Sequence, residues 1–267
     1  MCDLNPASNN YVAKKIGDSF ATWSDTDRRY REYGNYPNQS KYIRISMNSE
    51  VDNAVTNEAF LPFGFEGPMG TGKTTLASNL AVLWSNSDYK VAVLDADAQK
   101  SLTYWIEARK KYYGDDDIGL DLHPYNPHTF QEDLKNIKKN YNFVLIDSPP
   151  SITFETIQIV KNSDRVLIPM QPSPVDLLAT IPFLNIVKKE RKNATVILNR
   201  VLPRARLTEA MILRLRYAGA KIARSRVSSR VIFAETFNVG RGVADISVNS
   251  DPSKEIIKIG NEILRNF

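Results

Sequence analysis

Hydrophobic residues in the larger, later part of this chain gather in short, continuous runs bounded by turn residues. Six such runs follow one another at 60–66, 91–95, 119–122, 143–147, 165–169 and 195–199. Segments long enough for helices separate them, including 73–85, 101–112 and 129–139. Strands that alternate with helices form parallel sheets, and continuous apolar strands are typical of sheets covered on both faces. The pattern predicts an α/β fold with a mostly parallel, twisted sheet and helices on both faces.

Residues 1–56 have a different pattern, rich in Asn, Ser, Asp and Tyr and poor in aliphatic runs. Apolar residues recur there at helical spacing, which predicts a helix. These residues are Val12, Ile16, Phe20 and Trp23. Polar residues at 24–27 predict the cap of a short helix that runs to Tyr33, and 42–45 predict a short strand. We expect a partly helical N-terminal extension, 1–56, and one domain, 57–267. The aromatic side chains of the extension hold a partner or pack on the domain, and the sequence leaves both readings open.

Composition excludes several classes of protein. The chain has 267 residues, of which 42% are hydrophobic and 24% charged, as in globular proteins. Its one cysteine, Cys2, excludes a disulfide framework and also an iron–sulfur cluster held by two cysteines of each subunit. The two histidines leave few ligands for a Cys/His metal site. No apolar run reaches the roughly 18–20 residues of a membrane span, and the start does not resemble a secretory signal. We expect a cytoplasmic protein.

Positive charge is concentrated in one part of the chain. The formal net charge is +5, but residues 188–230 hold thirteen basic residues against Glu190 and Glu209, a local balance of +11, so that the remainder carries −6. This asymmetry favours a polyanionic partner, nucleic acid before membrane. Four cations of the block are candidate contacts to DNA phosphates if a helix begins near Ser225, namely Lys221, Arg224, Arg226 and Arg230. The alternatives for them are a solvated face or internal salt bridges.

A glycine-rich loop follows the first apolar run. Residues 67–75 satisfy the pattern G-x4-G-K-T, in which glycines let backbone amides surround phosphate oxygens at the start of a helix. Lys73 is placed to bridge the β- and γ-phosphates, and the Thr74 hydroxyl to bind Mg²⁺. The residues predicted to hold the nucleotide here are Gly67, Met69, Gly70, Thr71, Gly72, Lys73, Thr74 and Thr75. The bland alternative is a chance glycine turn that caps a helix.

Two acidic residues end later strands. Asp97 follows the run 91–95, where a carboxylate can hold the attacking water in line with the γ-phosphorus, and Asp147 ends the run 143–147, where it can reach the magnesium shell. The alternative for Asp97 is a capping role in an ordinary turn before the next helix. Behind a phosphate loop, we interpret both as catalytic acids that also contribute to the metal site with Thr74.

The segments VAVLDADAQKSLTYW, YNFVLIDSPPS, RVLIPMQPSPVDLL and VILNR, in this order, resemble the ParA family of partition ATPases, and the small ParF-like members above all. The resemblance covers about 60–267. It implies a MinD-like P-loop ATPase of the deviant Walker A class that binds ATP and Mg²⁺ and dimerises around ATP. It also implies non-specific DNA binding, association with the nucleoid, and release when a ParB-like or other adaptor stimulates hydrolysis. By the same resemblance Asp97 orients water, Asp147 is the Walker B acid, Asn199 contacts adenine, and the loop 171–174 lies near the base or the dimer interface.

The chain departs from the family pattern at the start of the phosphate loop and after the second strand. The family loop normally begins Lys-Gly-Gly, and its signature lysine reaches the partner subunit's nucleotide, whereas this chain has Pro68, Met69 and Gly70 at these positions. Ala98 stands where proline is usual. Three consequences are open: another cation serves across the dimer, hydrolysis is slow, or ATP is bound without turnover.

Three functions are compatible with these features. The leading one is an ATP-dependent DNA partition or positioning ATPase, and the alternative is a nucleotide-gated DNA-binding or regulatory protein with weak or no turnover. A small-molecule kinase or ligase is the third, although no acceptor site is evident. The apolar and basic residues of 253–267 favour a packed last helix over a membrane-docking one. Higher assemblies beyond a dimer are left open.

Overall fold

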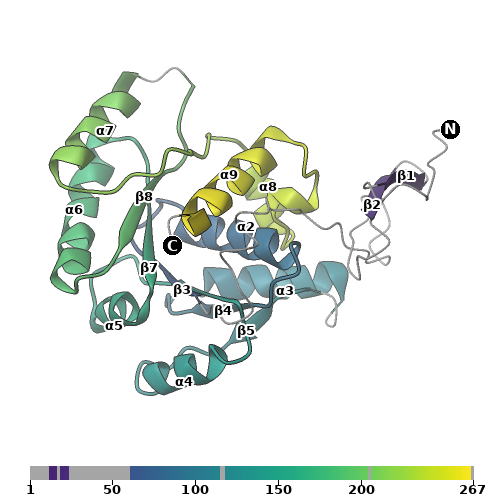
Figure 1. Cartoon of the computed structure of the whole chain (residues 1–267), viewed down its shortest axis with the longest axis horizontal. Coiled ribbons are helices and arrows are strands. Elements are labelled where there is room, and N and C mark those ends of the chain that lie inside the picture. Colours follow the sequence, from purple (N-terminus) through teal and green to yellow (C-terminus); the bar gives the residue numbers. More distant parts are fainter. Residues whose placement is uncertain (1–11, 17–18, 24–60, 115–117, 204–205, 266–267) are drawn as a thin grey trace.

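A single six-stranded parallel sheet forms the centre of the molecule (Figure 1). The computed structural model describes residues 12–16, 19–23, 61–114, 118–203 and 206–265. All neighbouring strands of the sheet pair in parallel. In spatial order the strands are β5 (Asp121–His123), β4 (Val91–Asp95), β6 (Phe143–Asp147), β3 (Leu61–Phe65), β7 (Arg165–Met170) and β8 (Ala194–Leu198). The predicted fold class is therefore confirmed.

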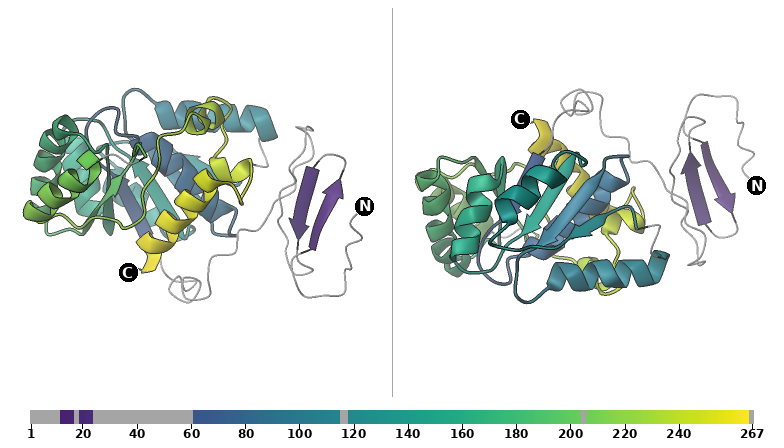
Figure 2. Two further views of the ribbon diagram at one scale, coloured as in Figure 1. Left: turned by 90° about the horizontal axis from the view of Figure 1, so that it is seen from above. Right: turned by 90° about the horizontal axis from the view of Figure 1, so that it is seen from below.

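Helices cover both faces of this sheet (Figure 2). Side chains alternate between the faces, so Phe63, Phe65 and Leu145 pack on one side, while Val144 and Ile146 pack on the other. The first face is covered by α2 (Lys73–Ser85), α3 (Ser101–Tyr113), α8 (Ile232–Asn238) and α9 (Asp251–Arg265). The second is covered by α4 (Phe130–Ile137), α5 (Phe154–Asn162), α6 (Pro174–Lys189) and α7 (Arg206–Tyr217). Each buried strand thus faces apolar helices on both sides, which explains the continuous hydrophobic runs.

The helix predicted through Val12 and Trp23 is wrong. This segment forms an antiparallel pair of strands, β1 (Val12–Ile16) and β2 (Ser19–Trp23), in which Val12 is paired with Trp23. β-Branched and aromatic residues favour strands, and the two residues between the strands, Gly-Asp, are a common hairpin sequence. These local preferences outweigh the helical spacing. The predicted elements at 24–33 and 42–45 lie outside the described residues.

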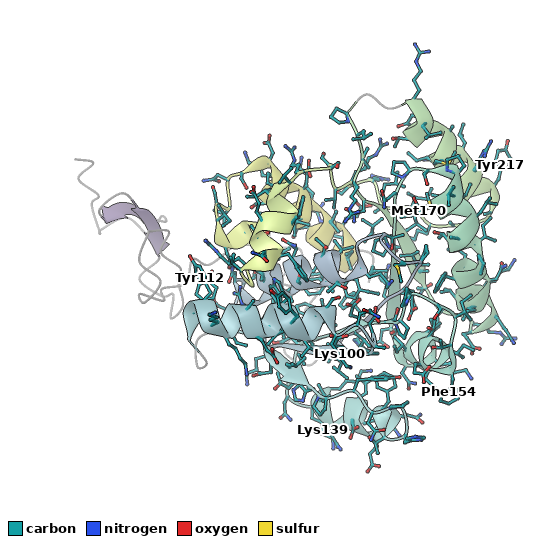
Figure 3. All side chains as sticks on the ribbon, turned by 180° about the vertical axis from the view of Figure 1, so that it is seen from behind. Lys100, Tyr112, Lys139, Phe154, Met170 and Tyr217 are labelled. Atoms are coloured by element: carbon teal, nitrogen blue, oxygen red, sulfur yellow. The ribbon has the colours of Figure 1, made fainter. Side chains whose placement is uncertain are left out.

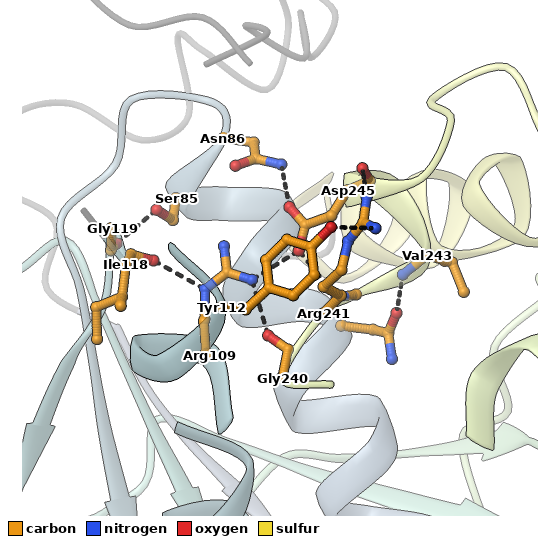
Figure 4. A network of polar contacts seen from close by, with 12 residues as sticks. Ser85, Asn86, Arg109, Tyr112, Ile118, Gly119, Gly240, Arg241, Val243 and Asp245 are labelled. Carbon is orange, nitrogen blue, oxygen red and sulfur yellow. Dashed lines mark hydrogen bonds and ion pairs between the residues drawn. The ribbon is translucent and has the colours of Figure 1, made fainter. Parts of the chain in front are cut away.

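A buried ion pair joins α3 to the segment that precedes α9 (Figure 4). Arg109 and Asp245 are both fully buried, with 2.6 Å between Nη1 and Oδ2. Arg109 also donates to the carbonyl oxygens of Ile118 and Gly240. Gly240 has φ +69°, and a Cβ atom there would lie 2.0 Å from the backbone nitrogen of Arg109. Removing one partner of such a pair typically costs about 3–5 kcal/mol, so the network fixes the C-terminal segment against α3.

The strands end at one edge of the sheet, and the predicted site residues follow them there. Phe65 is in register with Asp147, and Asp147 with Asp95. Ligands of parallel α/β sheets bind beyond the carboxyl ends of the strands. In the part of the chain that the structure describes, every helix is too short or too polar to cross a membrane.

Candidate functional site

The glycine-rich loop lies between β3 and α2, and its backbone conformation requires glycine. Gly72 has φ +96°, a conformation that side chains disfavour, and a Cβ atom there would lie 2.2 Å from the Asn199 amide nitrogen. The Asn199 amide donates to the Thr71 carbonyl oxygen over 2.8 Å, and Thr71 itself donates to the Pro68 carbonyl oxygen over 2.9 Å. Met69, by contrast, is 74% exposed at the tip of the loop. The loop is thus a preformed turn braced from the end of β8.

The Lys73 side chain lies inside this loop. It is buried, and its amine donates to the carbonyl oxygens of Gly67, at 2.9 Å, and Pro68, at 3.3 Å. Burial lowers the pKa of the Lys73 amine, whereas the nearby carboxyls of Asp147, Asp97 and Glu66 oppose that shift. An ammonium group surrounded by a loop of glycine backbone is the arrangement that binds phosphate oxygens.

Thr74 and Asp147 meet beside the loop. The Thr74 hydroxyl donates to Asp147 Oδ2 over 2.6 Å, and Asp147 is fully buried. Its second carboxylate oxygen, Oδ1, has no hydrogen-bond partner among the described residues. A hydroxyl and a carboxylate with an unpaired oxygen are hard ligands of the kind that Mg²⁺ takes. The donor set therefore fits magnesium at the position that the sequence predicted.

Asp97 lies in the turn after β4, on the same edge of the sheet. Its Oδ1 accepts a hydrogen bond from the Gln99 amide over 3.0 Å, and its own amide donates to Asp95 Oδ1. The carboxylate of Asp97 is close enough to Lys73 and Asp147 to affect the pKa of both. The structure thus brings Lys73, Thr74, Asp147 and Asp97 together, with Lys73 and Asp147 buried and Thr74 and Asp97 half-buried.

A cavity of about 320 Å³ opens beside the phosphate loop. Thr75 of α2 and Asn199 lie in its wall together with residues from the segment before α8 and from α8 itself. The other lining residues include Ser228, Ser229, Arg230 and Phe233 from these two segments, Tyr104 from α3, and Arg200, which follows Asn199. A hollow with an aromatic ring and several polar groups, next to a phosphate loop, is large enough for a nucleobase. The contribution of residues 228–233 has no signal in the sequence, because a long segment separates them from the loop.

The condition for the predicted basic ridge, a helix beginning near Ser225, is not met in the described residues 206–265. Residues 221–228 run extended beside β8, and isolated bridges pair Ile222 with Val196 and Ser228 with Val201. The backbone amides of Arg224 and Ser225 donate to the carboxylate of Glu262 in α9. Side-chain acceptors that bond to backbone amides in this way compete with helix formation. The predicted basic ridge on one helix face is therefore not formed.

Two of the four candidate DNA-binding cations are held in ion pairs. Arg226 lies 3.0 Å from Glu209, and Arg230 lies 3.2 Å from Glu255 of α9. Glu255 is distant in sequence, so the low number of acids within the basic block did not reveal this pairing. Lys221 is exposed and forms no ion pair among the described residues.

Glu66, which the sequence analysis did not single out, and Gln171 of the predicted loop 171–174 also lie at this edge. Glu66, the residue directly before the loop, is fully buried and bonds to Ser148 over 2.8 Å. The Gln171 amide donates to the Gly70 carbonyl oxygen over 3.1 Å, which places the predicted loop 171–174 against the tip of the phosphate loop. The signal for Glu66 was a charged residue at the end of an apolar strand.

Stability in the absence of nucleotide should fall as the pH rises, because of Asp147. Burial, the largest cause, raises the pKa of this carboxyl to about 7 from 3.8. Between these values the folded chain holds a proton that the unfolded chain releases, so stability is lost as pH rises through the window. Asp147→Asn removes this loss, and at pH 8 we expect the variant to be more stable than the wild type by roughly 1–3 kcal/mol. The difference should shrink toward pH 4.

Urea unfolding of both proteins at pH 4.5 and pH 8, without nucleotide or Mg²⁺, measures this effect. The comparison at pH 4.5 is the internal control, because both side chains are then neutral in the folded chain and little of the pH window has been crossed. Equal unfolding free energies at pH 8 would contradict the raised pKa of Asp147. The variant should also lose the increase in ADP affinity that Mg²⁺ produces in the wild type.

Comparison with known proteins identifies the family of this chain. Residues 67–242 match the family model "CobQ/CobB/MinD/ParA nucleotide binding domain". The "Maintenance of carboxysome distribution protein A" of Halothiobacillus neapolitanus is 29% identical over 203 residues, which cover 73% of this chain and 92% of that protein.

Solved structures share the fold. A putative plasmid partition protein from Borrelia burgdorferi B31, bound to AMPPNP, superposes with a TM-score of 0.61 at 23% identity, covering 78% of this chain and 99% of that one. The septum site-determining protein MinD of Pyrococcus horikoshii OT3, complexed with Mg-ADP, gives a TM-score of 0.64 at 19% identity and covers 76% and 96% of the two chains.

Proposed function

The chain belongs to the CobQ/CobB/MinD/ParA nucleotide-binding family, whose ParA and MinD members are positioning and partition ATPases, and from this premise we propose that it is an ATP-dependent DNA partition or positioning ATPase. In this proposal residues 57–267 form the ATPase domain and 1–56 an appended segment. The protein dimerises when it binds ATP and then binds DNA without sequence preference. It releases the DNA when an adaptor protein stimulates ATP hydrolysis. It is then a cytoplasmic protein associated with the nucleoid.

The observation that carries the proposal is the meeting of Lys73, Thr74 and Asp147 at one strand edge. The Lys73 amine exchanges the loop carbonyls for phosphate oxygens. Thr74 and the unpaired oxygen of Asp147 hold Mg²⁺, which neutralises charge on the phosphates when bound. Asp97, in the turn after β4, orients the attacking water. The adjoining cavity at Asn199 takes the adenine base.

An apolar rim around the site supports dimerisation. Met69 of the phosphate loop, Phe154 at the start of α5 and Val175 and Leu178 of α6 are each more than 60% exposed. The bond between Gln171 and the phosphate loop places the start of α6 beside the loop tip. Exposed apolar side chains that surround a ligand site mark a surface that a partner covers. We assign this surface to a second copy of the chain in the ATP state.

Pro68 favours the second candidate function. It stands where the family has its signature lysine, and its carbonyl oxygen accepts a bond from Lys73. A cation that reaches the phosphates from outside raises the rate of phosphoryl transfer by about 10³–10⁵ in other enzymes. Without that lysine, ATP binding is retained while turnover is slow. A nucleotide-gated DNA-binding or regulatory protein is therefore the alternative to a turning-over ATPase.

DNA binding is supported by a set of exposed cations at the opposite edge of the sheet from the nucleotide. They lie at the C-terminal ends of α6 and α7 and where the chain enters and flanks β8. None of them forms an ion pair among the described residues. We call this set, which consists of Lys188, Lys189, Arg191, Arg214, Arg216 and Lys221, the basic surface. Tyr217, at the end of α7, is 92% exposed and points outward beside it (Figure 3).

Co-sedimentation with duplex DNA of arbitrary sequence tests the proposed function. We expect binding with ATP and Mg²⁺, little binding with ADP or without nucleotide, and a steep loss of affinity with salt. Equal DNA binding in all three nucleotide states would contradict the proposal, because the protein would then bind DNA through its basic residues without control by ATP. ATP hydrolysis that accelerates with DNA and a partner separates the motor from the gated binding protein.

Removing three cations of the basic surface should weaken DNA binding and its salt dependence. For the triple variant Lys188→Ala/Lys189→Ala/Arg191→Ala, we expect the slope of log affinity against log salt to fall by roughly 2–3, because each lost phosphate contact removes about 0.9. The control is Arg226→Ala, which removes a cation already paired with Glu209 and should change the slope by less than about 0.9, the value of one phosphate contact. A larger change for Arg226→Ala than for the triple variant would assign the DNA contact to Arg226.

A further inference from the structure

Glu66 is a buried acid for which the nucleotide site described above has no use. It follows β3 directly and precedes Gly67, yet its side chain is 0% exposed. Burying a carboxyl group is unfavourable unless hydrogen bonds compensate. We therefore asked which contact compensates for burying the Glu66 carboxyl directly before the phosphate loop.

The alternation of side chains places Glu66 on the second face of the sheet. Phe63 and Phe65 pack toward α2, whereas a Cβ atom on Gly64 would meet Ser163 and Ile159 of α5. Glu66 continues the Gly64 side. Asp147 lies on the α2 side, where it accepts the bond from Thr74. Glu66 and Asp147 thus lie on opposite faces, so Glu66 is not a further ligand of the same Mg²⁺.

The partner of Glu66 is Ser148, the residue directly after Asp147. Phe65 and Asp147 are in register, so Glu66 and Ser148 are the next pair beyond the strand ends. The Ser148 hydroxyl oxygen lies 2.8 Å from Glu66 Oε2 and 2.5 Å from the carbonyl oxygen of Phe65. This bond extends the pairing of β3 and β6 by one residue, to the point where the phosphate loop begins and the loop after Asp147 begins.

We propose that Glu66 is a positioning residue that, through Ser148, fixes the backbone on both sides of the site and so holds Asp147 toward Thr74. The proposal rests on the proposed function, because it assigns a role in holding Mg²⁺ with the nucleotide. A partner one step behind a metal ligand commonly determines the ligand's orientation. Loss of the pair leaves Asp147 on its strand but allows β6 and its following loop to shift relative to β3.

The contact is one between uncharged groups. A hydroxyl has one hydrogen, and the Phe65 carbonyl oxygen at 2.5 Å competes for it. A protonated Glu66 satisfies both contacts by donating to the Ser148 oxygen. Burial, which raises the pKa of the Glu66 carboxyl well above its usual value, agrees with this state. Glutamine has the same length and an N–H donor at the same position, so Glu66→Gln preserves the contact and Glu66→Ala removes it.

The test compares Glu66→Ala, Glu66→Gln and Ser148→Ala with the wild type, each as the full chain. We measure the affinity for ADP with and without Mg²⁺, and kcat and KM for ATP. For Glu66→Ala and Ser148→Ala we expect the affinity gain from Mg²⁺ and kcat to fall by roughly 10- to 100-fold, as for lost partners of metal ligands. ADP affinity without Mg²⁺ should change less than about threefold, and Glu66→Gln should restore both losses to within about threefold.

Ser253→Ala is the matched control, because Ser253 is equally buried and donates to the Val243 carbonyl oxygen away from the site. It should lower stability without changing the Mg²⁺ effect. An unchanged Mg²⁺ effect in Glu66→Ala would overturn the proposal, and so would Glu66→Gln as impaired as Glu66→Ala. A wild type that binds Mg-ADP but hydrolyses no ATP would contradict the ATPase assignment alone, since the Mg²⁺ effect still reports on Glu66.

Discussion

Replacing Lys73 by alanine is expected to abolish ATP-dependent dimerisation and DNA binding. The buried amine of Lys73 is the cation inside the phosphate loop, where it bonds to the loop's own carbonyl oxygens. A preorganised charge in a site from which water is excluded stabilises bound phosphate far more than a charge at the surface does. In enzymes, the loss of one such group typically lowers the catalytic rate by about 10²–10³. Light scattering with ATP and Mg²⁺ reports the dimer, and co-sedimentation reports DNA binding.

The fold should survive this substitution, because a buried ammonium group is costly and its removal leaves only two backbone carbonyls to rehydrate. A thermal melt of the variant without nucleotide checks this point. Lys135→Ala is the control for the loss of one positive charge, since Lys135 is exposed on α4 and lies outside the basic surface. A Lys73→Ala protein that still binds DNA only with ATP would refute the assignment of the phosphate loop.

Replacing Asp97 by alanine is expected to stop hydrolysis and leave ATP binding intact. The half-buried Asp97 lies in the turn after β4, where the charge of its carboxylate reaches both Lys73 and Asp147. Positioned acids and bases contribute about 10²–10⁴ to the rates of such reactions. Without Asp97, the protein should stay dimeric on DNA in the presence of ATP. Phosphate release and a DNA wash-off assay measure the two effects.

Asp133→Ala supplies the comparison for Asp97→Ala. Asp133 is also a partly exposed acid near the start of a helix, where it accepts a bond from Thr129, and it lies away from the phosphate loop. That variant should keep wild-type turnover. If Asp97→Ala hydrolyses ATP at the wild-type rate, the local bond to the Gln99 amide is the whole role of Asp97, and another group orients the water.

Several features could be predicted from the sequence because short segments encode them. Continuous apolar runs such as 91–95 and 143–147 predicted buried strands, and the structure has strands at those residues. Strands that run parallel bring their ends to one edge, so the order of loop, Asp97 and Asp147 along the chain already implied a common site. The left-handed glycine at Gly72 likewise follows from the local motif.

Predictions failed where local signals competed within a segment, or where contacts from a distant segment decided its conformation. The spacing of Val12, Ile16, Phe20 and Trp23 is helical, but the same residues favour strands, and the structure has β1 and β2. The serines and arginines after Lys221 looked compatible with a helix. Acceptors from α9 instead bind the backbone amides of Arg224 and Ser225, and no count of residues within the segment reveals them.

The sequence by itself determined the fold class, the phosphate loop and the strands that carry its acidic partners, because each depends on residues close together in the chain. Only the tertiary structure decided which charges are available. It paired Arg230 with Glu255, buried Glu66 against Ser148, and left Lys188 and its neighbours exposed at the far edge of the sheet. The energetic contribution of a charged group depends on its solvation and on the partners that folding brings near it. Those partners lie on segments that are distant in the chain.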